Sequence, residues 1–133
     1  MIDIRNDYTI SSLGQMIDPV IELSGKKIDS INRDFDTAKG APVFTVKGKY
    51  TSQGWTEWTQ GFQFGSEILQ FDATNQQKYL DWGREHTLKY MATHVSHTGV
   101  HDHGFNNVST YGNLLRLMPV SYTHLTLPTN GTV

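Results

Sequence analysis

The stretch WTQGFQFGSEILQF, residues 58–71, decides the fold. Bulky apolar residues and glycines recur in it every three or four positions, as Trp58, Gly61, Gly65 and Ile68 show. This spacing places them on one face of a helix. Glycines four residues apart leave room for a second helix to approach closely. The stretch therefore predicts a helix that is packed tightly on one side.

Helical spacing also governs the residues before this stretch. Apolar side chains recur every three or four positions within residues 13–35, which favours an amphipathic helix. Pro19 lacks a backbone N–H and does not fit an unbroken helix interior, whereas Asp18 and Pro19 make a good N-cap and first-turn pair. We therefore expect a short helix up to about Ile17 and a second helix from Pro19 to about Phe35.

The remaining segments are also predicted to be helices joined by loops. Thr74 followed by Gln77 is a capping-box pattern, which predicts a helix start between them. Together the segments indicate an all-α fold of antiparallel helices. The expected elements are a loop over residues 37–52 with at most a short extended piece at 43–46, a helix from about Asn75 to His94, a loop over residues 96–105, and an amphipathic helix from about Val108 to Leu117.

Composition excludes several classes of function. The net charge of −2 gives no electrostatic reason to expect nucleic acid or an anionic membrane as a partner. There is no cysteine, so disulfide and thiolate chemistry are excluded and the redox compartment stays open. No apolar run approaches the roughly 20 residues that span a bilayer. The first residues lack the apolar core of a signal peptide, and the sequence does not indicate a compartment.

The last residues form a separate case. Residues 120–129, VSYTHLTLPT, resemble the in-frame translation of a transposase adapter used to prepare shotgun DNA libraries. We therefore expect residues 119–133 to be a non-native tail. Residues 1–118 are then expected to be the amino-terminal part of a larger catalytic domain. The alternative is a natural strand, since Val, Tyr and Thr alternate there.

Two motifs carry a family resemblance. WTQGFQFG, residues 58–65, is followed some forty residues later by HDHGF, residues 101–105. In this order and spacing the pair resembles glycoside hydrolase families 88 and 105, the unsaturated uronyl hydrolases, which show W-T-x-G-F-x-x-G on an early helix and H-D-x-G-F in a loop. The resemblance covers roughly residues 19–117, about the first third of such an enzyme. It implies an (α/α)6 toroid.

The resemblance also implies a reaction. The family removes a 4,5-unsaturated uronic acid from the non-reducing end of an oligosaccharide by hydrating the double bond, and it needs no cofactor. One of its two functional aspartates falls on Asp102, the expected proton donor, and its sugar-lining tryptophan falls on Trp58. His101 is the expected partner that orients the acid or the substrate carboxylate. Trp55 and Phe105 complete the expected substrate-binding set.

The residue types suit this chemistry on physical grounds. Protonating a carbon–carbon double bond needs a carboxylic acid held in place, and burial or a second carboxylate keeps such an acid protonated. The face of an aromatic ring packs against the apolar C–H side of a sugar. The plainer interpretations are that the aromatic side chains are core, that Asp102 caps a helix or turn, and that Glu57 and Glu67 are solvated or capping groups.

The histidines offer another alternative. His94, His97, His101 and His103 with Asp102 supply nitrogen and oxygen donors of the kind that transition metals bind. The spacing His94-x-x-His97 has no glutamate in the position of a zinc protease, so we expect no metal. A plainer role is a hydrogen bond to Asp102 or to the substrate carboxylate. His103 departs from the family motif, where an apolar residue is more usual.

The sequence is also compatible with two other functions. The first is another toroid enzyme that acts on saturated uronides, either a glycosidase or a polysaccharide lyase. The second is a non-catalytic helical module that binds sugar. If the chain is the expected fragment, it lacks the second acid and most of the ring, so we expect it to be inactive by itself.

Overall fold

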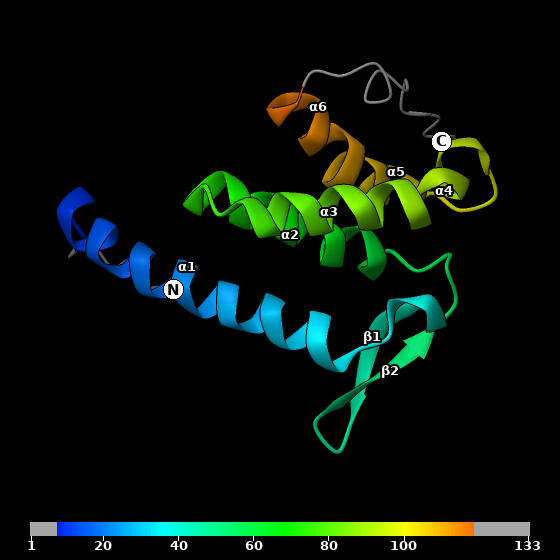
Figure 1. The fold of residues 1–133 in the computed structure, drawn as a ribbon, viewed down its shortest axis with the longest axis horizontal. Helices are drawn as coiled ribbons and strands as arrows, with labels where there is room; N and C mark the ends of the chain where they lie inside the picture. Colours follow the sequence, from blue (N-terminus) through cyan, green and yellow to red (C-terminus); the bar gives the residue numbers. More distant parts are fainter. Residues whose placement is uncertain (1–7, 119–133) are drawn as a thin grey trace, which may run out of the picture.

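The computed structural model describes residues 8–118, and the predicted adapter-derived tail, residues 119–133, lies outside them. The described chain is mostly helical, as expected, with one small sheet that was not expected (Figure 1). The elements in chain order are α1 (Ile10–Asp34), η1 (Thr37–Lys39), β1 (Ala41–Val46), β2 (Lys49–Gln53), α2 (Thr59–Thr74), α3 (Gln77–Tyr90), α4 (Ala92–Ser96), α5 (His103–Asn107), η2 (Val108–Gly112) and α6 (Asn113–Leu117).

Helix α1 is continuous, so the predicted break at Pro19 is wrong. A capping box starts the helix earlier, where Thr9 and Ser12 satisfy each other's backbone N–H groups. Pro19 removes the hydrogen bond that the Gln15 carbonyl would accept. Gln15 is exposed, so water can satisfy that carbonyl and the helix continues through the proline. The predicted end near Phe35 is confirmed, because Phe35 is the C-cap.

Strands β1 and β2 form an antiparallel hairpin where a loop was predicted. Lys47 and Gly48 connect them, and both have positive φ, 51° and 75°. A two-residue turn of this kind has the twist that paired strands require. Lysine rarely takes positive φ, which is why the sequence did not indicate this turn. Only the first two residues of the hairpin, Ala41 and Pro42, are buried, and β1 packs against α2.

Helix α2 is the central element of the described fold (Figure 1). It contributes Phe64 to a cluster with Met91 and Tyr111, and Ile68 to a cluster with Leu80 and Leu114. Because the two α2 residues lie one turn apart, both clusters draw on the same helix face. The periodicity of residues 58–71 therefore predicted the helix and part of its buried side. Gly61, Gly65 and Ile68 are buried as expected, whereas Trp58 is about half exposed and Phe64, outside the predicted face, is fully buried.

The turn between α2 and α3 differs from the predicted capping box. Thr74 is the last residue of α2, and its hydroxyl donates a hydrogen bond to the Gln70 carbonyl at 2.6 Å. Asn75 ends α2 in a left-handed conformation with φ 55°. Gln76 precedes α3 without a side-chain cap. The Thr74 hydroxyl also accepts a long hydrogen bond from the Gln76 N–H at 3.4 Å, but the predicted capping box with Gln77 does not form.

The two motif glycines of α2 receive the helical segment that follows Asp102. A Cβ atom built on Gly61 would collide with the backbone and side chain of Asn106, and one on Gly65 would lie 2.7 Å from the Ser109 carbonyl oxygen. The Gly61 N–H also donates to Asn106 Oδ1 at 2.8 Å. Tight packing on this side, as predicted, is confirmed.

This contact leads to a stability prediction. Gly61→Ala is expected to lower the free energy of unfolding by about 1–3 kcal/mol, because the added methyl group meets backbone atoms that cannot move aside. Urea unfolding followed by circular dichroism measures the change. The matched control is Gly14→Ala on exposed α1, where nothing lies within 4 Å of the new atom. That variant is expected to be about 0.5–1 kcal/mol more stable. Equal effects of both substitutions would contradict the proposed packing.

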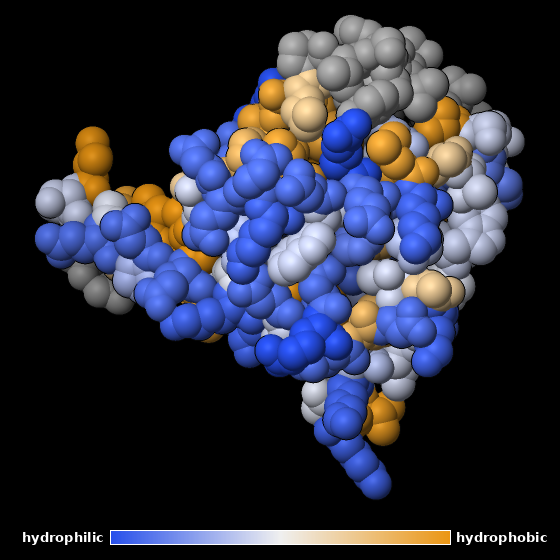
Figure 2. Space-filling view, in the orientation of Figure 1, coloured by the Kyte–Doolittle hydropathy of each residue, from blue (hydrophilic) through white to orange (hydrophobic). Residues whose placement is uncertain are grey.

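Part of the surface is apolar. Figure 2 shows apolar residues at the free end of α1 and over α6. Ile10, the first residue of α1, is 93% exposed, and Leu115 of α6 is 38% exposed. A chain with such patches has surface that another element or molecule can cover. Across residues 8–118, none of the helices has the length and apolarity to cross a membrane.

Candidate functional site

Asp102 lies where the loop after α4 meets α5. It occupies the N-cap position with helical backbone angles, φ −64° and ψ −12°, yet its side chain makes no capping hydrogen bond. The alternative that Asp102 caps a helix through its side chain is therefore wrong, whereas the alternative that it is a turn residue agrees with its place in the turn before α5. The carboxylate oxygen Oδ1 lies 3.0 Å from Nε2 of His101, and the Asp102 side chain is 26% exposed. The geometry leaves this carboxylate free to meet a molecule from solvent.

A hollow of about 350 Å³ is lined by residues that precede and follow Asp102 in the chain. The lining comprises His101, Gly104, Phe105, Val108 and Ser109. Two apolar side chains, one imidazole and one hydroxyl therefore surround the space. Asp102 is not part of the lining, but it directly follows His101, which is. A few polar groups on an apolar surface are typical of a small-ligand site.

A π-helical turn shapes one side of the hollow. Val108 and Ser109 belong to η2, which interrupts the α-helical winding between α5 and α6. Such turns are uncommon and often occur at functional sites, because they turn side chains away from the regular helix pattern. The Ser109 carbonyl accepts a hydrogen bond from the Asn113 side chain at 2.9 Å. The first residue of α6 therefore holds the widened turn through its side chain.

Exposed aromatic rings extend from the hollow onto α2. Phe105 lies 6.4 Å from Phe62, and Phe62 lies 5.3 Å from Trp58, measured between ring centroids. All three side chains are about half exposed. The interpretation that these aromatic residues are core is wrong for this row, although it is right for Phe64. Exposed rings in a row offer apolar faces to the C–H groups of a sugar.

Trp55 lies in a different cluster from Trp58. Its ring stacks on the buried His103 ring at 5.5 Å and 9°, and meets His94 and His97 edge to face. The three imidazoles are joined by short contacts, 2.8 Å between His94 Nδ1 and His103 Nδ1, and 2.7 Å between His97 Nδ1 and His103 Nε2. Trp55 is therefore packed on histidines, whereas the substrate-binding prediction placed it on a sugar.

Burial keeps the inner histidines neutral. Burial, together with the charges that His103 and His97 would carry, lowers the pKa of His94 from 6.5 to about 4. Burial also lowers the pKa of His103, with a further contribution from His97 and an opposing one from the Asp102 carboxylate. A charged imidazole loses its hydration in this environment. Both rings are thus uncharged at neutral pH.

The histidines do not converge on an ion. Their nitrogens point at one another in pairs, and in the described residues 8–118 no set of three or more His, Cys, Asp or Glu side chains is arranged to hold a metal. Of the histidines, His101 is the one that approaches Asp102, with 3.0 Å between its Nε2 and the carboxylate oxygen Oδ1. His94, His97 and His103 bond to each other.

Glu67 is a second buried group, and the expectation that it is solvated is wrong. Its carboxylate is fully buried on α2. His86 Nδ1 of α3 lies 2.9 and 3.1 Å from the two carboxylate oxygens, and Asn32 of α1 donates to one of them at 2.8 Å. These bonds satisfy a group that would be costly to bury alone. Glu67 joins three helices and serves packing.

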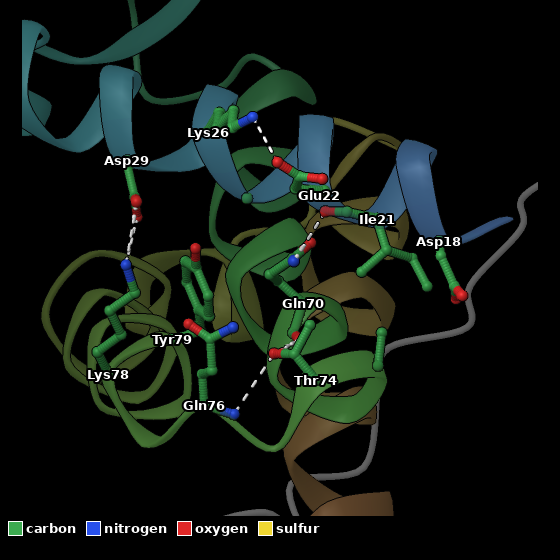
Figure 3. A pocket seen from close by; sticks show the side chains of 12 residues that line it. Asp18, Ile21, Glu22, Lys26, Asp29, Gln70, Thr74, Gln76, Lys78 and Tyr79 are labelled. Atoms are coloured by element: carbon green, nitrogen blue, oxygen red, sulfur yellow. Dashed lines mark hydrogen bonds and ion pairs between the residues drawn. The ribbon is translucent and has the colours of Figure 1, made fainter.

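A larger hollow, about 430 Å³, lies elsewhere, between α1 and the α2–α3 turn (Figure 3). Four of its charged groups form two pairs: Lys26 with Glu22 at 2.5 Å within α1, and Lys78 with Asp29 at 2.9 Å between α3 and α1. Gln70 of α2 donates to the Ile21 carbonyl of α1 at 3.0 Å. The bonds from Lys78 and Gln70 hold α1 against its neighbours. The hollow lined by His101 and Phe105 is therefore the candidate site.

The site has no counterpart among the known proteins with which the chain was compared. No family model, no curated protein and no solved structure matches the chain. The family resemblance of the two motifs therefore stays a prediction. Of the predicted residues, His101 and Phe105 line the hollow, Asp102 directly follows His101, and Trp58 reaches the hollow through Phe62. Trp55 belongs to the histidine cluster.

Sequence reasoning missed two contributors. Phe62 links the tryptophan to the hollow, and Asn106 joins the histidine cluster to α2. Both residues have a signal in the sequence that could have identified them. Phe62 is inside the first motif, one residue after the glycine, and Asn106 follows the second motif directly. A short-range pattern cannot show that these segments meet, because 45 residues separate Gly61 from Asn106.

Proposed function

We propose that this chain forms the first part of an (α/α)6-toroid glycoside hydrolase that removes a 4,5-unsaturated uronic acid from oligosaccharides. The observation that carries the proposal is the position of Asp102. Its side chain makes no capping hydrogen bond, and the residue before it, His101, lines a hollow with exposed aromatic rings nearby. A carboxyl group that is not used to cap a helix, close in the chain to an apolar surface, suits proton transfer to a sugar ring.

Asp102 is the proposed acid in the reaction. The protonated carboxyl group donates its proton to C4 of the double bond, and water adds at C5. The product is a hemiketal, which opens and releases the next sugar. The reaction consumes one water molecule and needs no cofactor. Contact with His101 at 3.0 Å supports a role for the imidazole in orienting the acid.

The aromatic row is the proposed sugar platform. Phe105 sits in the hollow, and Phe62 and Trp58 continue the row along α2. The row contains Trp58, which the motif resemblance assigned to the sugar pocket. Stacking of this kind orients a ring without demanding a particular hydroxyl pattern. The site therefore favours an oligosaccharide that presents its non-reducing end to Asp102.

His103, the departure from the family motif, does not weaken this proposal. Its side chain is 2% exposed and packs in the histidine cluster under Trp55. It is not among the residues that line the hollow. The substitution therefore changes the support of the loop and leaves the lining of the site unaltered.

The exposed apolar surface of the described helices supports the proposed toroid. Leu69 on α2, Leu88 on α3 and Leu115 on α6 are each more than a third exposed. Exposed leucines on three neighbouring helices need a covering layer. A second ring of helices would supply one. The described helices would then form the beginning of the toroid.

The test uses the full-length protein encoded by the parent gene. Two matched substrates are offered, an unsaturated uronyl disaccharide made with a polysaccharide lyase and its saturated counterpart. Loss of the ultraviolet absorbance of the double bond, together with release of the second sugar, is expected for the unsaturated substrate alone. Release from the saturated substrate alone would indicate a uronide glycosidase. Binding of both without turnover would indicate a sugar-binding module.

A further inference from the structure

Asn106, at the inner end of the histidine cluster, is anchored on both sides by backbone. Asn106 Oδ1 accepts from the Gly61 N–H at 2.8 Å, and Asn106 Nδ2 donates to the Glu57 carbonyl at 3.2 Å. A backbone N–H only donates and a carbonyl only accepts. The amide orientation of Asn106 is therefore settled by its partners.

The anchored amide reaches the first of the three rings. Asn106 Nδ2 faces His94 Nδ1 at 3.1 Å, and His103 Nδ1 faces the same His94 nitrogen at 2.8 Å. The other nitrogen of His103, Nε2, lies 2.7 Å from His97 Nδ1. A neutral imidazole donates at one nitrogen and accepts at the other, so His103 can bond to both neighbouring histidines at once.

His103 is consequently held on every side. Both of its ring nitrogens are bonded, Trp55 covers one face, and the ring is almost fully buried. A further hydrogen bond joins the cluster to α5, because the Asn107 side chain of α5 donates from Nδ2 to the His94 carbonyl at 3.0 Å. A side chain fixed in this way fixes its own backbone.

His103 is the residue directly after Asp102, and it is the first residue of α5. We propose that His103 and Trp55 are positioning residues that hold Asp102 at the edge of the hollow. This inference rests on the proposed function of Asp102. Neither residue lines the hollow, so neither would act on substrate directly. Their effect on the reaction comes from geometry, where a displacement of about 1 Å can cost a factor of about 100 in rate.

The principal test is His103→Phe in the full-length protein. Phenylalanine keeps an aromatic ring against Trp55 but removes both hydrogen bonds. The variant is expected to fold, because His94 Nδ1 retains Asn106 and the exposed His97 can bond water. We expect kcat to fall by about tenfold to a hundredfold with KM within about twofold, since the substrate surface is untouched. Trp55→Leu removes the stacked ring and is expected to act in the same direction.

The matched control is His97→Gln, which alters only the exposed end of the chain of bonds. It is expected to change kcat by less than about threefold, because His103 keeps its bond to His94 and its contact with Trp55. A loss in this variant equal to that in His103→Phe would overturn the assignment to His103.

Amide hydrogen exchange provides a readout that does not depend on any substrate. In His103→Phe, the amides of residues 102–106 are expected to exchange at least about tenfold faster, while those of α3 keep their wild-type rates. Unchanged exchange in residues 102–106 overturns the inference, whatever the activity on uronides. If wild-type protein does not act on unsaturated uronides and exchange still accelerates, the proposed function fails while the anchoring of Asp102 by His103 is supported.

Discussion

Asp102→Asn in the full-length protein is expected to lower kcat/KM on an unsaturated uronyl disaccharide by about 100-fold to 10,000-fold. The amide has nearly the same shape as the carboxylic acid but no acidic proton to give to C4. Because the Asp102 carboxylate makes no capping bond, the free energy of unfolding should change by no more than about 0.5 kcal/mol. Steady-state kinetics and urea unfolding measure the two quantities separately.

The control for this substitution is Asp81→Asn. Asp81 is an exposed carboxylate on α3 that accepts a hydrogen bond from Gln77 at 2.9 Å, and it lies outside the site. Its kinetics should match those of the wild type. Calorimetric titration with the disaccharide should show that Asp102→Asn still binds. Wild-type turnover by Asp102→Asn would remove Asp102 from the role of acid and favour a binding module.

The folded protein is expected to lose about 3 kcal/mol of stability as the pH falls from 6.5 to about 4, through His94 alone. In the unfolded chain His94 takes up a proton as the pH drops through 6.5. In the folded chain it stays neutral down to about pH 4, because it is buried beside His103 and His97. The unfolded state therefore binds more protons in this window and is favoured there. Above pH 6.5 the contribution of His94 to stability is complete. His103, whose pKa is also lowered, acts in the same direction.

Urea unfolding at several pH values between 4 and 8 measures this dependence. His94→Gln is neutral throughout the range, so the variant should show a shallower decline below pH 6.5, even though it is less stable at pH 7. A histidine outside the cluster provides the control, His101→Gln on the exposed loop, which should keep the wild-type decline. An unchanged decline in His94→Gln would show that the acid sensitivity has another source.

Much of the helical framework was predictable because it depends on local periodicity. The spacing around Gly61 and Gly65 predicted α2 and its tightly packed side, and the loop that carries Asp102 was placed between helices. Helix periodicity is a property of neighbours three and four residues apart, so it can be read without knowledge of the fold. The membership in a uronyl hydrolase family and the toroid stay predictions.

The predictions that proved wrong all concern features that local periodicity does not determine. Pro19 was predicted to break a helix that in fact continues, and Lys47 did not indicate a hairpin turn. Glu67 was assigned to solvent and lies buried against His86 and Asn32. In each case the outcome depends on exposure or on a partner from a distant segment. Propensity is a weak guide wherever tertiary contacts or solvent access decide.

For the candidate site, too, some features follow from the sequence and others only from tertiary contacts. By itself, the sequence determined which side chains are available: an aspartate in a loop, aromatic residues near a helix start and a group of histidines close together. Only the tertiary structure decided their roles, because α5 packs against α2 and brings Asn106 to Gly61. That contact brings the Asn106 amide to His94, within the histidine cluster on which Trp55 stacks, and Asp102 lies outside this cluster with its carboxylate 3.0 Å from His101. Hydrogen bonds between segments 45 residues apart have no local signature, and here they separate the supporting residues from those that face the hollow.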